Sequence, residues 1–337
     1  MVDGVKIKNF GPIRDLDWQR LGKINLIIGE NGAGKTFLLK ALYCSLRALE
    51  DFKRGNDPRS INDILCDKLY WTYQADKIGD LVSKGAGEQL SCLLKVGDRH
   101  FSYKFGKDTV KNIVRVEHDG LGREERSMFL PAKEVLSLYR LILDSRDQDH
   151  LFGFDDTYLD LVRALRAPTR QGRNFPEFAE SRGVLEAMLG GRVEYDENAK
   201  VWQFKKGNQK FSIGVTAEGV KKIAILDTLL GNRYIRPQSV IFFDEPESAL
   251  HPEAISKLID IIATLSERGI QFFLASHSYF VINKLFLIAR QKKMSIPMLS
   301  ITGDKWIQDD LINGMPDNPI IDETIRLYRE EVEINLS

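Results

Sequence analysis

A glycine-rich stretch near the N-terminus, GENGAGKT at residues 29–36, fits the pattern G-x-x-x-x-G-K-[ST] at every fixed position. Glycines let successive backbone N–H groups point inward, and a following helix N-terminus adds partial positive charge, so such a loop can hold phosphates. The lysine can reach the β- and γ-phosphates, and the next hydroxyl can ligate Mg²⁺. The stretch therefore predicts a site for ATP and Mg²⁺. Thr36 is expected to bind ATP and also to ligate the metal. The residues expected to bind ATP are Gly29, Glu30, Asn31, Gly32, Ala33, Gly34, Lys35 and Thr36.

Two further groups of polar residues follow apolar runs in the second half of the chain. The run 239–243 ends in Asp244 and Glu245. We expect Asp244 to hold Mg²⁺ through water, and Glu245 to orient or deprotonate the attacking water. The run 271–275 is followed, after a serine, by His277, which we expect to contact the γ-phosphate. The alternatives are a solvated strand end for the acids and a structural role for the histidine. The expected catalytic residues are Lys35, Glu245 and His277.

Apolar patterns predict the elements that must hold these residues. Residues 24–28 form a β-favouring run before the loop, and residues 37–43 have the spacing of a helix packed on a sheet. The runs 239–243 and 271–275 are typical of strands buried in a parallel sheet. A glycine-rich turn without a ligand is the weaker interpretation, because strand, loop and helix follow in the order that phosphate binding requires. The predicted fold class is α/β, with a P-loop nucleotide-binding core.

The rest of the N-terminal part is predicted to be rich in strands. Apolar and polar residues alternate on both sides of Gly97 and Asp98, which indicates a hairpin. Residues 1–130 are therefore expected to form the N-terminal half of the core with a β-rich lobe. The predicted strands are 5–8, 16–18, 92–105, 112–117 and 127–130.

A helical insert is predicted at residues 131–190. Pro131 is placed where a helix would start and run through Ile142, and helical patterns return at 158–165 and 176–189. The insert carries an excess of arginines, which is either a patch for nucleic acid or an acidic partner, or an ordinary solvated face. We favour the solvated face, because no aromatic residues interleave with the arginines. The arginines are Arg163, Arg166, Arg170, Arg173 and Arg182.

Composition narrows the class of protein. The 337 residues include 48 basic and 48 acidic ones, so no overall field attracts nucleic acid or a membrane. No run is long enough for a membrane span and no export signal is seen, so a cytoplasmic location is expected. Three separated cysteines, Cys44, Cys66 and Cys92, favour reduced thiols over zinc or a disulfide framework.

Together these motifs resemble the ATP-binding-cassette (ABC) type of ATPase. The most similar branch contains RecF, the structural-maintenance-of-chromosomes (SMC) heads and the overcoming-lysogenization-defect family. The resemblance rests on VKIKNFGPIRDLDW before the glycine loop, FFDEPESALHP at 242–252 and ASHS at 275–278, with FLPAKE at 129–134 as a further match. It implies an ABC-type head that binds two ATP molecules between two subunits arranged head to tail. A homodimer or higher oligomer is therefore expected, with residues 248–250 crossing to the partner subunit.

The same resemblance implies a signature stretch that completes the partner's site. The candidate is 215–219, where Thr216 and Gly219 are expected to contact a γ-phosphate across the interface. Ala217 stands where the family has serine, so Thr216 either replaces that serine or only caps the following helix. The resemblance also implies a glutamine that senses the metal, for which Gln74 and Gln89 are the two candidates. Residues 191–337 would hold this stretch, both acids, the histidine and an acidic final helix from Ile320.

The predicted function is ATP hydrolysis coupled to regulation. The nuclease domain that overcoming-lysogenization-defect proteins append is not expected in a tail this short, so a sensor ATPase controlling a separate effector, as in antiphage defence, is favoured by analogy. A GTPase is disfavoured because Phe286 replaces the aspartate of N-K-x-D. The alternatives are a DNA-binding repair ATPase of the SMC and RecF kind, with nucleic acid on the arginine-bearing insert, and a nucleotide-locked scaffold.

Overall fold

The computed structural model describes residues 1–85, 87–167, 176–302 and 305–336, and a six-stranded sheet lies at its centre. The strand order is β14-β13-β3-β12-β11-β7; all neighbours pair in parallel except β14, which is antiparallel to β13. The strand before the glycine loop, β3, is therefore flanked by two strands from the C-terminal part of the chain. The bounds are β3 Ile24–Gly29, β7 Ser127–Leu130, β11 Val240–Asp244, β12 Gln271–Ser276, β13 Pro297–Thr302 and β14 Lys305–Asp310.

The register of this sheet brings the predicted chemical groups to one edge. Ser276 at the end of β12 pairs with Ile28, and Asp244 at the end of β11 pairs with Ala275. Because the strands are parallel, their carboxyl ends meet at the same edge, where open α/β sheets bind ligands.

One hydrophobic core lies between this sheet and a second, fully antiparallel sheet with the order β2-β1-β4-β5-β6. Helix α1 fills the space between them and is buried on nearly all sides, with Tyr43 packed edge-on against Phe129 and Phe242. This burial fixes the helix that begins at the glycine loop. The bounds are β1 Val2–Phe10, β2 Ile13–Gln19, β4 Leu90–Val96, β5 Arg99–Phe105, β6 Arg115–Glu117, α1 Lys35–Asp51 and α2 Ile61–Tyr73.

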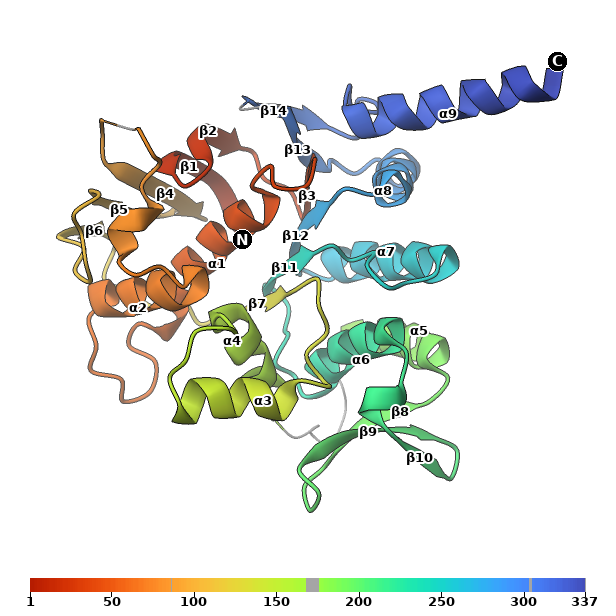
Figure 1. Cartoon of the computed structure of the whole chain (residues 1–337), viewed down its shortest axis with the longest axis horizontal. Coiled ribbons are helices and arrows are strands. Elements are labelled where there is room, and N and C mark those ends of the chain that lie inside the picture. The colour runs from red at the N-terminus through yellow and green to blue at the C-terminus, as the bar shows by residue number, and fades with distance from the viewer. Residues whose placement is uncertain (86, 168–175, 303–304, 337) are drawn as a thin grey trace.

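A second core covers the opposite face of the parallel sheet, where α6, α7 and α8 lie side by side in Figure 1. The last helix, α9, extends away from the rest of the molecule (Figure 1). Among the described residues, none of the helices combines the length and apolar character needed to cross a bilayer. The bounds are α3 Tyr139–Leu143, α4 Asp156–Leu165, α5 Ala179–Leu189, α6 Glu218–Gly231, α7 Pro252–Glu267, α8 Tyr279–Lys292 and α9 Pro319–Leu336.

A small antiparallel sheet with the order β10-β9-β8 lies beside α3 and leads into α6 through a short 3-10 turn, Ile213–Val215. It forms a separate projection at the lower end of the view in Figure 1. Its strands are β8 Arg192–Asp196, β9 Val201–Lys206 and β10 Gln209–Ser212.

Most predicted elements are confirmed, including the hairpin of β4 and β5 and the helical character of α4 and α5. Two expectations are wrong. The helix expected from Pro131 starts only at Tyr139, because tertiary contacts hold the intervening backbone: the Ala132 carbonyl accepts a hydrogen bond from Ser248. The N-terminal part also contains a helix, α2, that was not predicted. Its capping box, Ser60 with Asp63, was the missed signal.

Candidate functional site

The glycine loop turns directly from β3 into α1. Gly34 is the N-cap of α1 with a φ of 97°, and a Cβ there would lie 2.9 Å from a side-chain carbon of Pro12. Both facts favour glycine at this position. Lys35 Nζ donates to the carbonyl oxygens of Gly29 and Glu30, each at 2.8 Å, so the lysine closes the loop on itself. Burial lowers the pKa of Lys35 in spite of the nearby acids.

The loop and the end of β11 meet at a hydrogen bond between Thr36 and Asp244. Thr36 Oγ1 donates to Asp244 Oδ2 at 2.8 Å, while Asp244 Oδ1 is buried and, within the described chain, has no hydrogen-bond partner. Burial raises the pKa of Asp244, and the charge of Glu245 raises it further. A hydroxyl beside a carboxylate with one spare oxygen fits Mg²⁺, which favours hard oxygen ligands.

The rest of a Mg²⁺ coordination shell would come from outside the protein. In the described part of the chain, no group of three or more His, Cys, Asp or Glu side chains could hold a metal ion. Mg²⁺ is usually bound by one or two carboxylates together with phosphates and water, which agrees with a single Asp–Thr pair. The residues present therefore fit a metal ion that arrives with a nucleotide.

Glu245 and His277 face each other next to this pair. His277 Nδ1 lies 3.4 Å from Glu245 Oε1, and both side chains are partly exposed. Glu245 has a φ of 47°, a left-handed conformation that is uncommon outside glycine, and its N–H donates to the Ala275 carbonyl. Strained backbone of this kind is typical of functional sites, and here it sets where the carboxylate projects.

A second carboxylate in the same turn, Glu247, was not singled out from the sequence. Its Oε1 accepts from Ser276 Oγ at 2.7 Å, and none of the residues that the structure describes bonds to its buried Oε2. Glu247 also contributes to the negative field at Lys35. The spacing of Asp244, Glu245 and Glu247 on one turn was the available signal.

Sequence reasoning also missed Lys222, a buried lysine on α6. Its Nζ donates to the Glu245 carbonyl at 2.6 Å and to Ser248 Oγ, and Ser248 Oγ in turn donates to the Ala132 carbonyl. Burial lowers the pKa of Lys222 to about 8. This lysine joins α6 to the backbone of the predicted general base and to the loop expected to cross to a partner subunit.

The candidate signature stretch lies just before α6. The N-cap of α6 is Ala217, which makes no side-chain capping bond, so Thr216 does not cap this helix; its hydroxyl lies 3.4 Å from the Ser212 carbonyl. Gly219 is buried, and a Cβ there would come within 2.6 Å of the Ala249 carbonyl. Close packing inside the subunit thus requires glycine at 219, whatever contact it makes across an interface.

Comparison with known proteins places this site in a family. Residues 107–283, more than half of the chain, match the family model described as "AAA domain, putative AbiEii toxin, Type IV TA system". The chain belongs to this AAA family. Its glycine loop lies N-terminal to the matched region, and both acids and the histidine lie inside it.

Two of three curated relatives of this AAA protein carry nucleotide-related names. An ATP/GTP phosphatase of Helicobacter pylori is 21% identical over 87% of this chain and 89% of its own length. An uncharacterised protein of Methanocaldococcus jannaschii is 35% identical, over 33% of this chain and 47% of its own length. An arginine transport ATP-binding protein of Haemophilus influenzae is 33% identical, over 31% of this chain and 40% of its own length. This chain thus spans about half, or less, of the length of two of these relatives.

Solved structures show that the AAA protein has the fold of an SMC head. An SMC head bound to the C-winged helix domain of ScpA covers 93% of this chain and 98% of its own, with 14% identity and a TM-score of 0.58. An SMC head derived from Pyrococcus furiosus, bound to the C-terminal domain of ScpA, covers 96% of this chain and 99% of its own, with 13% identity and a TM-score of 0.53. The chain is a P-loop ATPase of the AAA/ABC type.

The remaining residues singled out from the sequence of the AAA protein are two glutamines and the arginines of the insert. Gln74 is the left-handed C-cap of α2, and Gln89 precedes β4; within the described chain, no interaction joins either to Thr36 or Asp244. Arg163 pairs with Asp147, and Arg182 pairs with Asp227, so these two arginines of the insert have partners inside the subunit. Arg170 and Arg173 lie outside the described residues.

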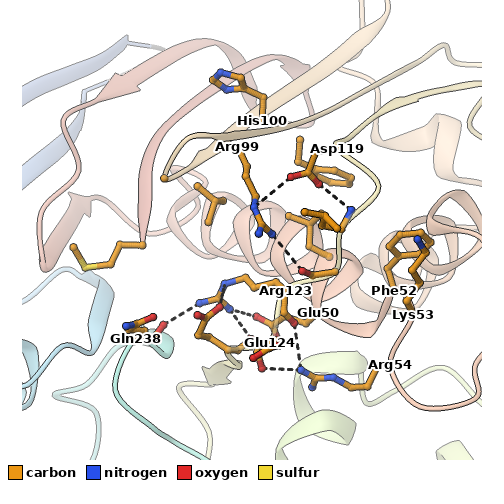
Figure 2. A pocket seen from close by; sticks show the side chains of 18 residues that line it. Glu50, Phe52, Lys53, Arg54, Arg99, His100, Asp119, Arg123, Glu124 and Gln238 are labelled. Carbon is orange, nitrogen blue, oxygen red and sulfur yellow. Dashed lines mark hydrogen bonds and ion pairs between the residues drawn. The ribbon is translucent and has the colours of Figure 1, made fainter.

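A pocket of about 750 Å³ lies at the opposite end of α1 (Figure 2). Fifteen residues separate Lys35 from Glu50, so the pocket is about 22 Å from the glycine loop along the helix. Its charges satisfy one another: Arg123 pairs with Glu50, and Arg99 pairs with Asp119. The dashed contacts in Figure 2 show these cations held by their own surroundings, so we assign the nucleotide to the glycine loop and not to this pocket.

Proposed function

We propose that this AAA protein binds Mg·ATP at Gly29–Thr36 and Asp244, hydrolyses it, and controls a separate effector protein through a nucleotide-dependent dimer. The Thr36–Asp244 hydrogen bond carries this proposal, because it joins the phosphate loop to the strand end that also presents Glu245. The buried, unpartnered Asp244 Oδ1 supports a metal ion at this point. When bound, Mg²⁺ neutralises charge on the phosphate oxygens and orients the terminal phosphate.

The side chains support hydrolysis as follows. Lys35 exchanges its two carbonyl partners for phosphate oxygens when the nucleotide enters. Glu245 accepts a proton from the water that attacks the γ-phosphorus, while the bond from that phosphorus to the bridging oxygen breaks and ADP leaves. His277 holds the Glu245 carboxylate by its Nδ1 and faces the departing phosphate. Lys222 fixes the backbone carbonyl of Glu245 and so acts as a positioning residue.

Two observations support the regulatory part of the proposal. The family description names a putative AbiEii toxin of a type IV toxin–antitoxin system, which favours a role in regulated defence such as antiphage defence. The α6 N-terminus carries exposed residues, including Val215 at 79% exposure, that a partner subunit would cover. A head-to-tail dimer with Thr216 and Gly219 facing the partner's nucleotide is consistent with both.

The test compares Glu245→Gln with Glu253→Gln, a matched change at an exposed glutamate of α7 that pairs with Lys257. Glu245→Gln should lower phosphate release by about 10²- to 10⁴-fold and should accumulate an ATP-bound dimer in light scattering, while Glu253→Gln should behave as wild type. Lys35→Ala should abolish nucleotide binding. Unchanged nucleotide affinity in Lys35→Ala, or wild-type turnover in Glu245→Gln, would refute the proposed site.

The effector is tested by native co-purification of tagged Glu245→Gln protein with ATP present. A stoichiometric protein partner identified by mass spectrometry supports the regulatory proposal and names the effector. Abundant nucleic acid without such a partner contradicts it in favour of a DNA-binding repair ATPase.

A further inference from the structure

The small sheet carries a row of three cations across its three strands. Lys205 is the Cα partner of Arg192 on one side and of Lys210 on the other, so the three side chains project from the same face. In the part of the chain that the structure describes, none of them forms an ion pair with an acid. Like charges directly opposite one another destabilise a sheet. An anion bound along the row would remove this repulsion.

The hairpin between β9 and β10 extends this positive surface. Its sequence from 204 to 211 is FKKGNQKF, with three lysines, no acid and an aromatic residue at each end. Lys206 is exposed at the turn, next to Lys205. Basic residues interleaved with aromatic ones are the composition that favours nucleic-acid strands. Two acids of β8, Glu194 and Asp196, share the face of the row. The pKa of Asp196 is lowered mainly by the backbone N–H donors of Ala199 and Asn198 and in part by Lys210.

A pocket of about 340 Å³ adjoins the row on the side of edge strand β10. The charged side chains in its described lining are all cationic: Arg140, Lys200 and Lys210. Arg140 is the one that meets an acid, Asp144, at 3.5 Å, and both side chains are exposed. Lys210 belongs to both the row and the pocket lining, so the row ends at edge strand β10, where the pocket begins. Side chains alternate along β9 and β10, so Trp202 and Phe211 project from the face opposite the row, and a ligand that reaches both must pass over this edge.

The inner wall of this pocket is aromatic and has free hydrogen-bonding groups. Tyr139 and Trp202 are each 4% exposed and pack against each other, yet the Tyr139 hydroxyl and the Trp202 indole N–H have no hydrogen-bond partner among the described residues. Phe211 at the rim is 40% exposed. These two groups have almost no solvent-accessible surface, so the exposed ring of Phe211 is the group on which a planar ligand would stack.

We propose that the small sheet is a binding site for single-stranded nucleic acid. Phosphates lie along Arg192, Lys205 and Lys210 on one face of the sheet, and the nucleic-acid strand passes over edge strand β10 so that one unpaired base enters the pocket beside Phe211. A duplex would present phosphates to the row but could not insert a base. DNA and RNA strands share the recognised chemistry, and the binding assay compares them.

The location gives the site a way to act on the nucleotide. Strand β10 ends at Ser212, and the 3-10 turn that follows leads directly to Thr216 and α6. Single-stranded nucleic acid bound on β10 would therefore order the segment expected to face a partner's nucleotide. Only this coupling rests on the proposed function; strand binding does not, and it should persist in the Lys35→Ala variant.

The experiment measures binding of labelled oligo-dT and oligo-U by fluorescence anisotropy as a function of salt. The three cations of the row together with Lys206 give four phosphate contacts, which predict a salt slope of about −2.8 for single-stranded nucleic acid and an affinity about 50-fold lower at about 200 mM than at about 50 mM salt. Replacing Arg192, Lys205 and Lys210 with Gln should leave one contact, a slope of about −0.7 and a loss of only about threefold.

Two further variants separate this site from general positive charge. Changing Lys8, Lys104 and Lys107 to Gln removes the same charge from exposed positions on or next to the antiparallel sheet, and affinity should stay at the wild-type value. Phe211→Ser should weaken binding roughly tenfold without altering the slope, since one stacked base is lost. The proposal is overturned if the row variant binds as wild type does, if the control loses as much, or if blunt duplex binds more tightly than either strand.

Discussion

Replacing Lys222 by methionine tests whether a buried cation positions the general base. In the wild type, the pKa of Lys222 falls from 10.5 to about 8, because burial outweighs the attraction of Glu247, Glu245, Asp244 and Glu218. The difference corresponds to about 3 kcal/mol. Between about pH 8 and 10.5 the unfolded chain keeps the proton on this lysine and the folded chain loses it. The free energy of unfolding should therefore rise by up to that amount as pH rises through this window.

Lys222→Met should remove this rise. At pH 7 the variant loses two charge-assisted hydrogen bonds, worth about 1.5–3 kcal/mol each, and also loses the burial penalty, so its stability should stay within about 3 kcal/mol of wild type. Urea unfolding at several pH values measures the difference between the two proteins, in which the titration of all other groups cancels. Identical pH dependence in both would refute the reasoning.

The same variant should lower ATP turnover more than nucleotide affinity, because the Glu245 carbonyl loses its donor. The matched control is Lys221→Met, the neighbouring buried lysine, whose amine instead contacts Glu134 and Ser137. That control should leave turnover at the wild-type value. Equal loss of turnover in both variants would point to damage to α6 and not to positioning of Glu245.

Asp244→Asn should raise the melting temperature of the nucleotide-free protein, since burial raises the pKa of Asp244 and its ionised form is costly at pH 7. Thermal unfolding with and without Mg·ATP checks this: wild type should gain stability with the ligand, and an equal gain in the variant would contradict a metal-binding role. The thiols of Cys44, Cys66 and Cys92 are buried, which raises their pKa to about 12, 11 and 11, so iodoacetamide at pH 8 should label them only after unfolding. Intact mass spectrometry measures the labels, and rapid labelling of the native protein would refute this.

The elements that are strongly patterned could be predicted from sequence. Strand β3, the loop and α1 follow from one motif and its flanks, and β11 and β12 follow from continuous apolar runs that only a buried parallel strand explains. Because parallel strands end at one edge, the meeting of Thr36 with Asp244 could be anticipated as well.

The remaining features depend on contacts that a linear pattern does not contain. The start of α3 shifts to Tyr139 because residues 131–138 bind other segments, including the loop at Ser248. In the sequence, Lys222 cannot be distinguished from an ordinary helix lysine. Only the packing of α6 against the turn after β11 buries it and lowers its pKa. The cation row on the small sheet likewise appears only when strand register pairs Lys205 with two distant residues.

The position of β3 in the central sheet has a consequence for synthesis of the protein. Both neighbours of β3, β12 (271–276) and β13 (297–302), come far later in the chain than β3 itself (24–29), so the phosphate loop stays without its supporting strands until residue 302 has left the ribosome. The Gln271 side chain, which bonds to the backbone of Val2 and Gly22, joins the two ends of the chain at the same late stage. Until then β3 exposes two open edges, a template for aggregation that a chaperone would have to cover. Nascent chains stalled before residue 271 should therefore be unable to bind nucleotide even though the whole glycine loop has been translated.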